Sequence, residues 1–264
     1  MLNLNLWQRT NGTASSSSDA VNAPKSARPL LKIAVLNTKG GCGKTTLSTS
    51  LAAYYAQHGF NTALLDMDPQ SSSLRWLANR GDRKPIIAGL NGADKSGRVT
   101  RSFQMRVPPD VERLIVDTPA AIDSLRLQDA IRGAHAIVIP VLPSDIDIHA
   151  ASRCVADLLL TGRIENRQER VAVVANRVKK QARMYETLRR FLESLQIPFV
   201  ATFRDTQNYV HATEKGLGVH ELKDHNVKEE RREWEPLIAW LESRPLSNLQ
   251  TAAPVTMLTG SSSS

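Results

Sequence analysis

Cysteine is scarce in this sequence, which contains only Cys42 and Cys154 among its 264 residues. Two thiols cannot build the disulfide framework of a small secreted domain, and by themselves they cannot supply a metal knuckle. No apolar run approaches the ~18 residues of a membrane-spanning helix, and no signal peptide shows its charged and apolar regions in order. These absences make the reducing cytoplasm the expected location of the protein.

The remaining composition is that of a globular protein with a large positive charge. Apolar residues make up 41% of the chain, which is enough for a buried core, although only 5% of the residues are aromatic. The formal net charge of +8 favours an anionic partner but does not identify it.

Two polar ends flank the part of the chain that is patterned for folding. Residues 1–28 contain the low-complexity run Ser15–Ser18 and prolines that interrupt helices, and residues 245–264 have the same character. We therefore expect a flexible leader over 1–28, one folded domain over 29–244 and a flexible tail over 245–264. A single domain of roughly 200–250 residues is ordinary.

Apolar runs alternate with helical segments inside the folded part. The runs are apolar throughout, which is typical of strands buried on both faces of a parallel sheet. The alternation predicts an α/β fold with a doubly wound, mostly parallel sheet and helices on both faces. Residues 81–110 show no readable pattern. The expected strands are Leu31–Leu36, Thr62–Asp66, Arg113–Asp117, Ala136–Leu142 and Arg170–Ala175, and the expected helices are Thr45–His58, Ile122–Arg132, Asp147–Leu160 and Gln181–Leu195.

A glycine-rich loop joins the first expected strand to the first helix. Its glycines let backbone N–H groups converge on phosphate oxygens, and the helix N-terminus adds the positive end of its dipole. The Lys44 side chain is placed to reach the β- and γ-phosphates of ATP, and the Thr45 hydroxyl to bind Mg²⁺. A glycine-rich turn that binds nothing is the alternative, and the register of Gly-Lys-Thr with strand and helix disfavours it. The expected ATP-binding residues of the loop are Lys39, Gly40, Gly41, Cys42, Gly43, Lys44, Thr45 and Thr46.

The loop also carries a second lysine that phosphate binding does not require. The first glycine of the common pattern is Thr38 here, and Lys39 follows it. In this the sequence resembles the deviant Walker A family, K-G-G-x-G-K-[ST], whose members include ParA, MinD, the nitrogenase iron protein and ArsA. The resemblance implies a P-loop NTPase fold and an ATP-dependent homodimer, in which Lys39 contacts the partner's nucleotide and acts in trans like an arginine finger. The alternative is that Lys39 is only an exposed loop charge.

The second expected strand ends in an acidic segment, Asp66-Met67-Asp68-Pro69-Gln70. This D-x-D-P-Q segment resembles that of ParA-type partition ATPases. The resemblance implies that Asp68 positions or activates the water that attacks the γ-phosphate, so Asp68 joins Lys39 and Lys44 as an expected catalytic residue. The alternative role for Asp68 is to cap the following helix. Asp66 is expected to support the metal shell or the loop.

The third expected strand ends at Asp117, followed by Thr118-Pro119-Ala120. An apolar strand ending in aspartate has the form of a Walker B element, so we expect Asp117 to hold Mg²⁺ together with Thr45, through a water molecule. The resemblance implies that 118–120 sense the γ-phosphate. It also implies that Asn176, after a later strand, recognises adenine, although an asparagine at a strand end is also a common turn residue.

Basic residues concentrate in one part of the chain. Ten Lys or Arg and four Glu lie between Thr161 and Arg204, a net of +6. The helix Gln181–Leu195 has an apolar stripe of Met184, Leu188, Phe191 or Leu192, and Leu195, with arginines on the opposite face. Such a surface favours sequence-independent binding to DNA phosphates, whereas solvated arginine on a surface helix is the plain alternative. The candidate DNA-binding residues are Arg177, Lys179, Lys180, Arg183, Arg189 and Arg190.

Taken together, the resemblance implies a slow ATPase of the ParA type. Such a protein forms a dimer with ATP, binds nucleoid DNA non-specifically and positions or segregates a plasmid, a chromosome or a protein body, while a partner protein stimulates hydrolysis. The alternative is a MinD-like, membrane-associated switch, which needs a basic amphipathic C-terminal helix. Residues Glu233–Glu242 are acidic on their polar side, and we expect Trp234, Trp240 and Leu241 to pack on the core.

Overall fold

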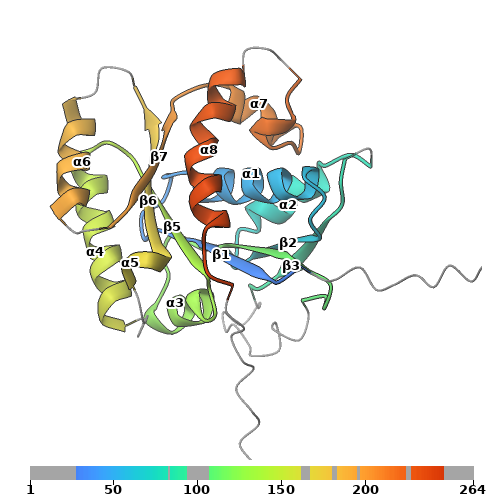
Figure 1. The fold of residues 1–264 in the computed structure, drawn as a ribbon, viewed down its shortest axis with the longest axis horizontal. Coiled ribbons are helices and arrows are strands. Elements are labelled where there is room, and N and C mark those ends of the chain that lie inside the picture. The colour runs from blue at the N-terminus through green and yellow to red at the C-terminus, as the bar shows by residue number, and fades with distance from the viewer. Residues whose placement is uncertain are drawn as a thin grey trace, which may run out of the picture.

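A computed structural model describes residues 28–82, 84–93, 107–161, 167–179, 183–194, 197–223 and 227–246 (Figure 1). Apart from Arg28, Pro245 and Leu246, the predicted leader and tail lie outside these residues, and the domain limits remain a prediction. The strands are β1 Leu31–Val35, β2 Thr62–Asp66, β3 Ile87–Asn91, β4 Arg113–Asp117, β5 Ala136–Val141, β6 Val171–Val178 and β7 Phe199–Arg204. The helices are α1 Lys44–Gln57, α2 Ser72–Ala78, α3 Ser124–Ile131, α4 Asp145–Thr161, α5 Arg167–Arg170, α6 Arg183–Ser194, α7 Asn208–Glu214 and α8 Lys228–Glu242, with a short 3-10 helix, η2, at Val219–Glu221.

The seven strands form one sheet in the order β3-β2-β4-β1-β5-β6-β7, and every neighbouring pair is parallel. This arrangement confirms the predicted doubly wound fold. Strands β2 and β4 have the predicted bounds, whereas β3 and β7 were not expected. Strand β3 lies at the sheet edge, where only Ile87 is buried and the following residues are part-buried or exposed, so it lacks the continuous apolar run that identifies a central strand.

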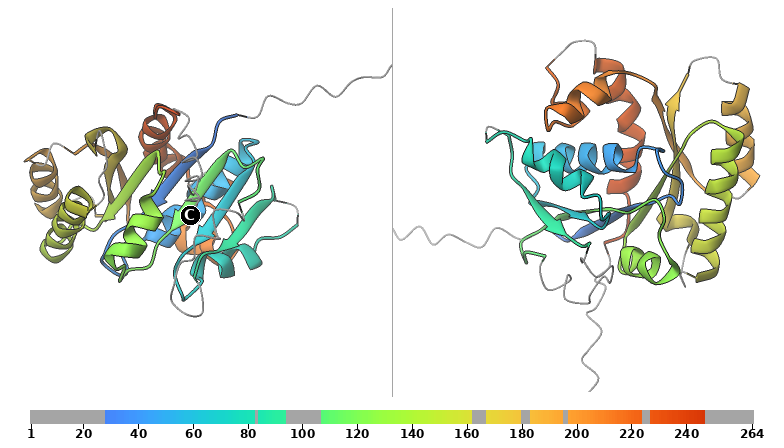
Figure 2. Two further views of the ribbon diagram at one scale, coloured as in Figure 1. Left: turned by 90° about the horizontal axis from the view of Figure 1, so that it is seen from below. Right: turned by 180° about the vertical axis from the view of Figure 1, so that it is seen from behind.

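Helices cover both faces of the sheet and divide the core in two. Buried side chains of α3, α4 and α6 pack with one set of strand residues, and those of α1, α2 and α8 pack with the other set. Within β1, for example, Ala34 faces the first cluster and Ile33 and Val35 face the second, as the two-residue repeat of a strand requires. Figure 2 shows the same separation from two further directions.

The predicted apolar face of α8 is confirmed, and that of α6 is confirmed for the two of its residues whose side chains the structure describes. On α8, Trp234 is 1% exposed and Leu241 is fully buried, while Trp240 packs at the edge of the same cluster. On α6, Leu188 is buried and Phe191 packs against the core. The side chains of Met184 and Leu192, together with Leu195, lie outside the described residues. Within the described part of the chain, no helix is long and apolar enough to cross a membrane.

The strand order places the carboxyl ends of three strands around one point. Strand β1 lies between β4 and β5, where the winding direction of the sheet reverses. Residues Val35, Asp66 and Asp117 are aligned across β1, β2 and β4. In open parallel sheets, ligands bind outside the carboxyl ends of the strands at such a switch point.

Candidate nucleotide-binding site

The glycine-rich loop occupies this switch point, between β1 and α1. At its start, the buried Asn37 donates from Nδ2 to the Pro140 carbonyl (2.7 Å) and accepts from the Lys39 amide at Oδ1 (3.0 Å). The loop ends at Gly43, whose φ of 94° is left-handed, immediately before α1 begins at Lys44. A strand and a helix therefore fix the two ends of a loop whose middle is glycine, as a phosphate-binding turn requires.

The two lysines of the loop have different surroundings. Lys44 is buried (7% exposed) and its Nζ donates to the Lys39 carbonyl at 3.0 Å. The Cys42 thiol donates to the same carbonyl at 3.3 Å, and burial raises the pKa of this thiol. Lys39 itself is an exposed residue. The loop thus holds the backbone of Lys39 at both its N–H and its carbonyl, and leaves the residue at the surface.

The acidic segment after β2 is folded around Asp66. Its Oδ1 accepts from the Asp68 amide (3.0 Å), and its Oδ2 accepts from the amides of Ser73 and Leu74 (3.0 and 3.1 Å). Asp66 therefore holds the acidic segment in place and caps α2, a role that Asp68 does not take; its support of the metal shell or the phosphate loop stays a prediction. Asp68 is half-buried and accepts from the Gln70 amide at 2.9 Å.

Asp117 is a buried carboxylate with one oxygen available to a ligand. Its Oδ1 accepts from Ser48 Oγ at 3.2 Å, while Oδ2 has no hydrogen-bond partner among the described residues. Burial raises the pKa of Asp117 to about 7; the adjacent Asp66 carboxylate adds to the rise, and the nearby hydroxyls of Thr45 and Ser48 oppose it. A bound cation would favour the charged form. Carboxylate and hydroxyl oxygens are the ligands that Mg²⁺ prefers, so Asp117 and Thr45 fit a magnesium site beside the loop.

A cavity of about 590 Å³ opens from the loop across the α1, α2 and α7 side of the sheet. Thr45 and Thr46 lie at one end, and Asn176 and Arg177 follow from β6. The volume falls in the range of small-molecule sites, ~300–1,000 Å³. The other lining residues are Ser72, Arg75, Trp76, Asn79, Arg204, Asp205, Thr206, Gln207, Tyr209, Val210, Thr213 and Glu214.

Asn176 joins this cavity to the loop. Its Nδ2 donates to the Cys42 carbonyl at 2.8 Å. A Cβ placed on Gly43 would lie 2.1 Å from the same Nδ2. The close approach explains why position 43 is glycine, in addition to its left-handed φ. The structure therefore places Asn176 at the border between the phosphate loop and the cavity.

Sequence reasoning missed most of the cavity wall. Helix α2 supplies Ser72, Arg75 and Trp76, and α7 supplies Tyr209 and Thr213. These residues form no local motif, because the two helices are more than 130 positions apart and meet only in the fold. Ser48, one turn after Thr45 on α1, has the i, i+3 spacing that could have indicated its contact with Asp117.

The structure describes the side chains of four of the six candidate DNA-binding residues. Arg177, Lys179, Arg189 and Arg190 are exposed. Arg177 lines the cavity and has a left-handed φ of 51°. Arg189 lies between Glu186 and Glu193 on α6, with N–O distances of 3.4 and 3.9 Å, so its charge is partly compensated. Lys180 and the side chain of Arg183 lie outside the described residues.

Comparisons with known proteins agree with this geometry. The profile of the CobQ/CobB/MinD/ParA nucleotide binding domain matches residues 33–219. The chain is 30% identical over 208 residues to a maintenance of carboxysome distribution protein A of Gloeobacter kilaueensis, covering 78% of this chain and 91% of that protein. It is 28% identical over 194 residues to the protein of the same name from Halothiobacillus neapolitanus, covering 72% of this chain and 87% of the relative.

Solved structures share the fold at low sequence identity. An apo McdA from Cyanothece superposes with a TM-score of 0.66 at 15% identity, covering 80% of this chain and 99% of that structure. A plasmid partition protein from Borrelia burgdorferi bound to AMPPNP superposes with a TM-score of 0.63 at 14% identity and the same two coverages. On the strength of the profile match and its agreement with the sheet order and phosphate loop, the chain belongs to the CobQ/CobB/MinD/ParA family of nucleotide-binding domains, as a ParA/MinD-type ATPase.

Proposed function

We propose that this chain binds Mg-ATP, forms a dimer in that state, and hydrolyses ATP slowly while positioning a cargo on non-specific DNA. The observation that carries the proposal is the position of the start of α1. It lies next to Asp117, whose Oδ2 is buried and unpartnered among the described residues, and its Thr45 and Thr46 line a cavity of 590 Å³. A phosphate cradle, a magnesium ligand and space for a nucleoside therefore adjoin one another.

The residues divide into binding and catalytic roles. Backbone amides of 40–46 and the Lys44 ammonium hold the phosphates. Thr45 and Asp117 hold Mg²⁺, which neutralises phosphate charge when bound. Asn176 lies where it can contact the base. Asp68, on the segment that Asp66 holds in place, orients the attacking water.

Lys39 gives the site its dependence on a second subunit. The loop fixes its backbone through the Asn37 side chain and the Lys44 ammonium, while the residue itself is exposed. In the proposed dimer the Lys39 ammonium reaches the nucleotide of the partner and stabilises negative charge there, as an arginine finger does. ATP bridging two subunits through this contact makes the dimer depend on the nucleotide.

The basic region and the names of the relatives support the proposed binding of DNA and cargo. A dimer doubles the surface formed by Arg177, Lys179, Arg189 and Arg190, and such contacts bind phosphates independently of sequence. Two relatives are named for carboxysome distribution, and others for chromosome partitioning and plasmid partition. The proposed cargo is accordingly a large body or a replicon, recognised through a stimulating partner protein, with the ATP dimer on the nucleoid. The membrane-switch alternative receives no support from α8, whose Trp234, Leu237 and Leu241 are buried against the sheet.

Binding to a random-sequence DNA duplex tests this function directly. The duplex is titrated with the chain in ATP, ADP or no nucleotide, at several salt concentrations. We expect the chain to bind DNA only in the presence of ATP. The logarithm of its association constant should fall steeply and linearly with the logarithm of the salt concentration, because phosphate contacts release counterions. Equal binding in all three states, or no binding in any, would contradict the proposal.

A further inference from the structure

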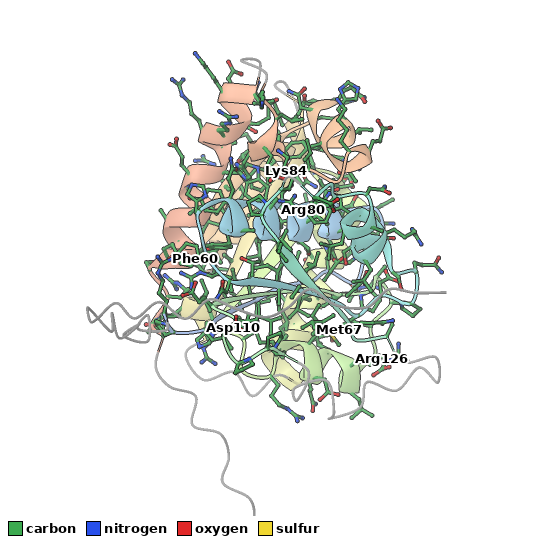
Figure 3. All side chains as sticks on the ribbon, turned by 90° about the vertical axis from the view of Figure 1, so that its right-hand side faces the viewer. Phe60, Met67, Arg80, Lys84, Asp110 and Arg126 are labelled. Atoms are coloured by element: carbon green, nitrogen blue, oxygen red, sulfur yellow. The ribbon has the colours of Figure 1, made fainter. Side chains whose placement is uncertain are left out.

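A buried ion pair lies just outside the cavity and links two of its walls. Arg80 comes two residues after the end of α2, and Glu221 is the last residue of η2. The guanidinium donates two hydrogen bonds to the carboxylate, from Nη1 to Oε2 and from Nη2 to Oε1, both 2.7 Å long. The side chains are only 4% and 1% exposed. Figure 3 labels Arg80 on the side of the molecule that carries α2 and α7.

Each end of this pair is held by further bonds. Arg80 also donates from Nη1 to the Gly216 carbonyl (3.1 Å) and from Nε to the Pro85 carbonyl (3.2 Å). Glu221 Oε2 accepts from the Gly218 amide at 3.0 Å. The paired side chains therefore connect the end of α2, the segment before β3, and the turn between α7 and η2.

The same two segments are in close backbone contact. Gly216 has a left-handed φ of 64°, and a Cβ on it would lie 2.5 Å from the Arg80 backbone nitrogen. Beside it, Trp76 Nε1 donates to the Leu217 carbonyl at 3.2 Å. The end of α2 and the turn after α7 thus form one closely packed unit.

This unit connects the ends of two helices that line the cavity. Helix α2 lines the cavity with Arg75, Trp76 and Asn79, and α7 lines it with Tyr209 and Thr213. The ion pair links the segment that follows α2 to η2 and, through the Gly216 carbonyl, to the turn that follows α7. At its other end α2 is capped by Asp66 of the acidic segment, so both ends of α2 are held by hydrogen bonds to neighbouring segments.

Stability alone does not account for a pair of this kind. Removing two charges from water is costly, and replacing a buried ion pair by apolar residues is often neutral or stabilising. A bidentate guanidinium–carboxylate pair does, however, impose a fixed distance and orientation.

We propose that Arg80 and Glu221 are positioning residues, which set the spacing of the α2 and α7 walls around the base and ribose and thereby determine the affinity for the nucleoside part of the nucleotide. The proposal rests on the proposed function, because it takes the cavity as the nucleoside site. The proposal predicts that only the contribution of the base and ribose to the binding free energy changes. Contacts to the phosphates are made by the glycine-rich loop and do not depend on the pair.

Two ligands separate these contributions. The dissociation constants of ADP and of pyrophosphate, both with Mg²⁺, are measured for the wild-type chain and for Glu221→Gln, by calorimetry for ADP and by displacement of ADP for pyrophosphate. We expect Glu221→Gln to raise the Kd of ADP by about tenfold, equivalent to about 1.4 kcal/mol, and to leave that of pyrophosphate unchanged. Equal weakening of both ligands, or no change in either, would overturn the inference.

Two further variants separate positioning from folding. Arg80→Met/Glu221→Leu removes both charges, so it should lower the melting temperature less than Glu221→Gln, which leaves the guanidinium buried without its carboxylate, and it should still show the ADP-specific loss. Glu242→Gln breaks the Arg113–Glu242 pair, whose arginine side chain is also 4% exposed and whose residues do not line the cavity; it should leave both constants unchanged. If wild-type protein failed to bind ADP, the proposed function would fail, and that result is seen before any variant is compared.

Discussion

Substitution of Gly43 by alanine tests the contact between the phosphate loop and Asn176. Two costs can be worked out from the structure. A left-handed conformation costs a non-glycine residue roughly 1–2 kcal/mol, and the φ of Gly43 is 94°. The new Cβ would also lie 2.1 Å from Asn176 Nδ2, so the bond from Asn176 to the Cys42 carbonyl must break, at about 1 kcal/mol. We expect Gly43→Ala to lower the free energy of unfolding by about 2–3 kcal/mol and to weaken ADP binding.

Gly59 provides the matched control. Its φ is 76°, and a Cβ placed on it has no atom within 4 Å, so Gly59→Ala incurs only the backbone cost, roughly 1–2 kcal/mol. Unfolding in urea, followed by tryptophan fluorescence, gives the free energies, and calorimetry gives the ADP affinities. Gly59→Ala should leave the affinity unchanged.

A double-mutant cycle isolates the contact. In Gly43→Ala/Asn176→Ala the displaced amide is absent, so the double variant should be more stable than the sum of the two single effects predicts, by about 1 kcal/mol. Additive effects in the cycle, or equal destabilisation by the Gly43 and Gly59 substitutions, would refute the reasoning.

Three further predictions concern Lys39, Asp68 and His220. Lys39→Ala should retain ATP binding through Lys44 and lose the ATP-dependent dimer in sedimentation; a variant that still dimerises would show that Lys39 does not act in trans. Asp68→Ala should abolish phosphate release while the ATP dimer persists, and an unchanged hydrolysis rate would place the catalytic carboxylate elsewhere. His220 is buried, and burial, followed by the positive charges of His58 and Arg231, lowers its pKa to about 3. Because the unfolded chain takes up this proton near pH 6.5, the stabilisation is complete above that pH and is lost as the pH falls, by about 2 kcal/mol at pH 5. In urea unfolding at pH 7.5 and 5.0, His220→Phe should lose that much less than wild type, and equal losses would contradict the buried neutral state.

The central strands and the phosphate loop were predictable from sequence for a physical reason. Strands β2 and β4 are buried on both faces, so each appears as an unbroken apolar run that ends abruptly at Asp66 or Asp117. The loop is a continuous segment whose spacing reflects its own backbone geometry. The bounds of β1, β2, β4 and β5 were predicted to within one residue, whereas β6 ends three residues after its predicted end at Ala175.

The sheet edges and the cavity were not predictable in the same way. Only Ile87 is buried in β3 and only Ala201 and Phe203 in β7, so both strands lack the apolar run of a central strand. The bond from Asn176 to Cys42 joins residues 134 positions apart, and the Arg80–Glu221 pair spans 141. Such contacts are determined by the order of strands in the sheet, and a single sequence does not reveal which distant side chains that order brings together.

Sedimentation velocity of the full chain with Mg-ATP and with Mg-ADP tests the central claim most directly. The account predicts a dimer in ATP and a monomer in ADP, since only ATP presents a γ-phosphate that the Lys39 ammonium of a second subunit can reach. The same mass in both nucleotides would contradict the claim that this site is completed by a second copy of the chain.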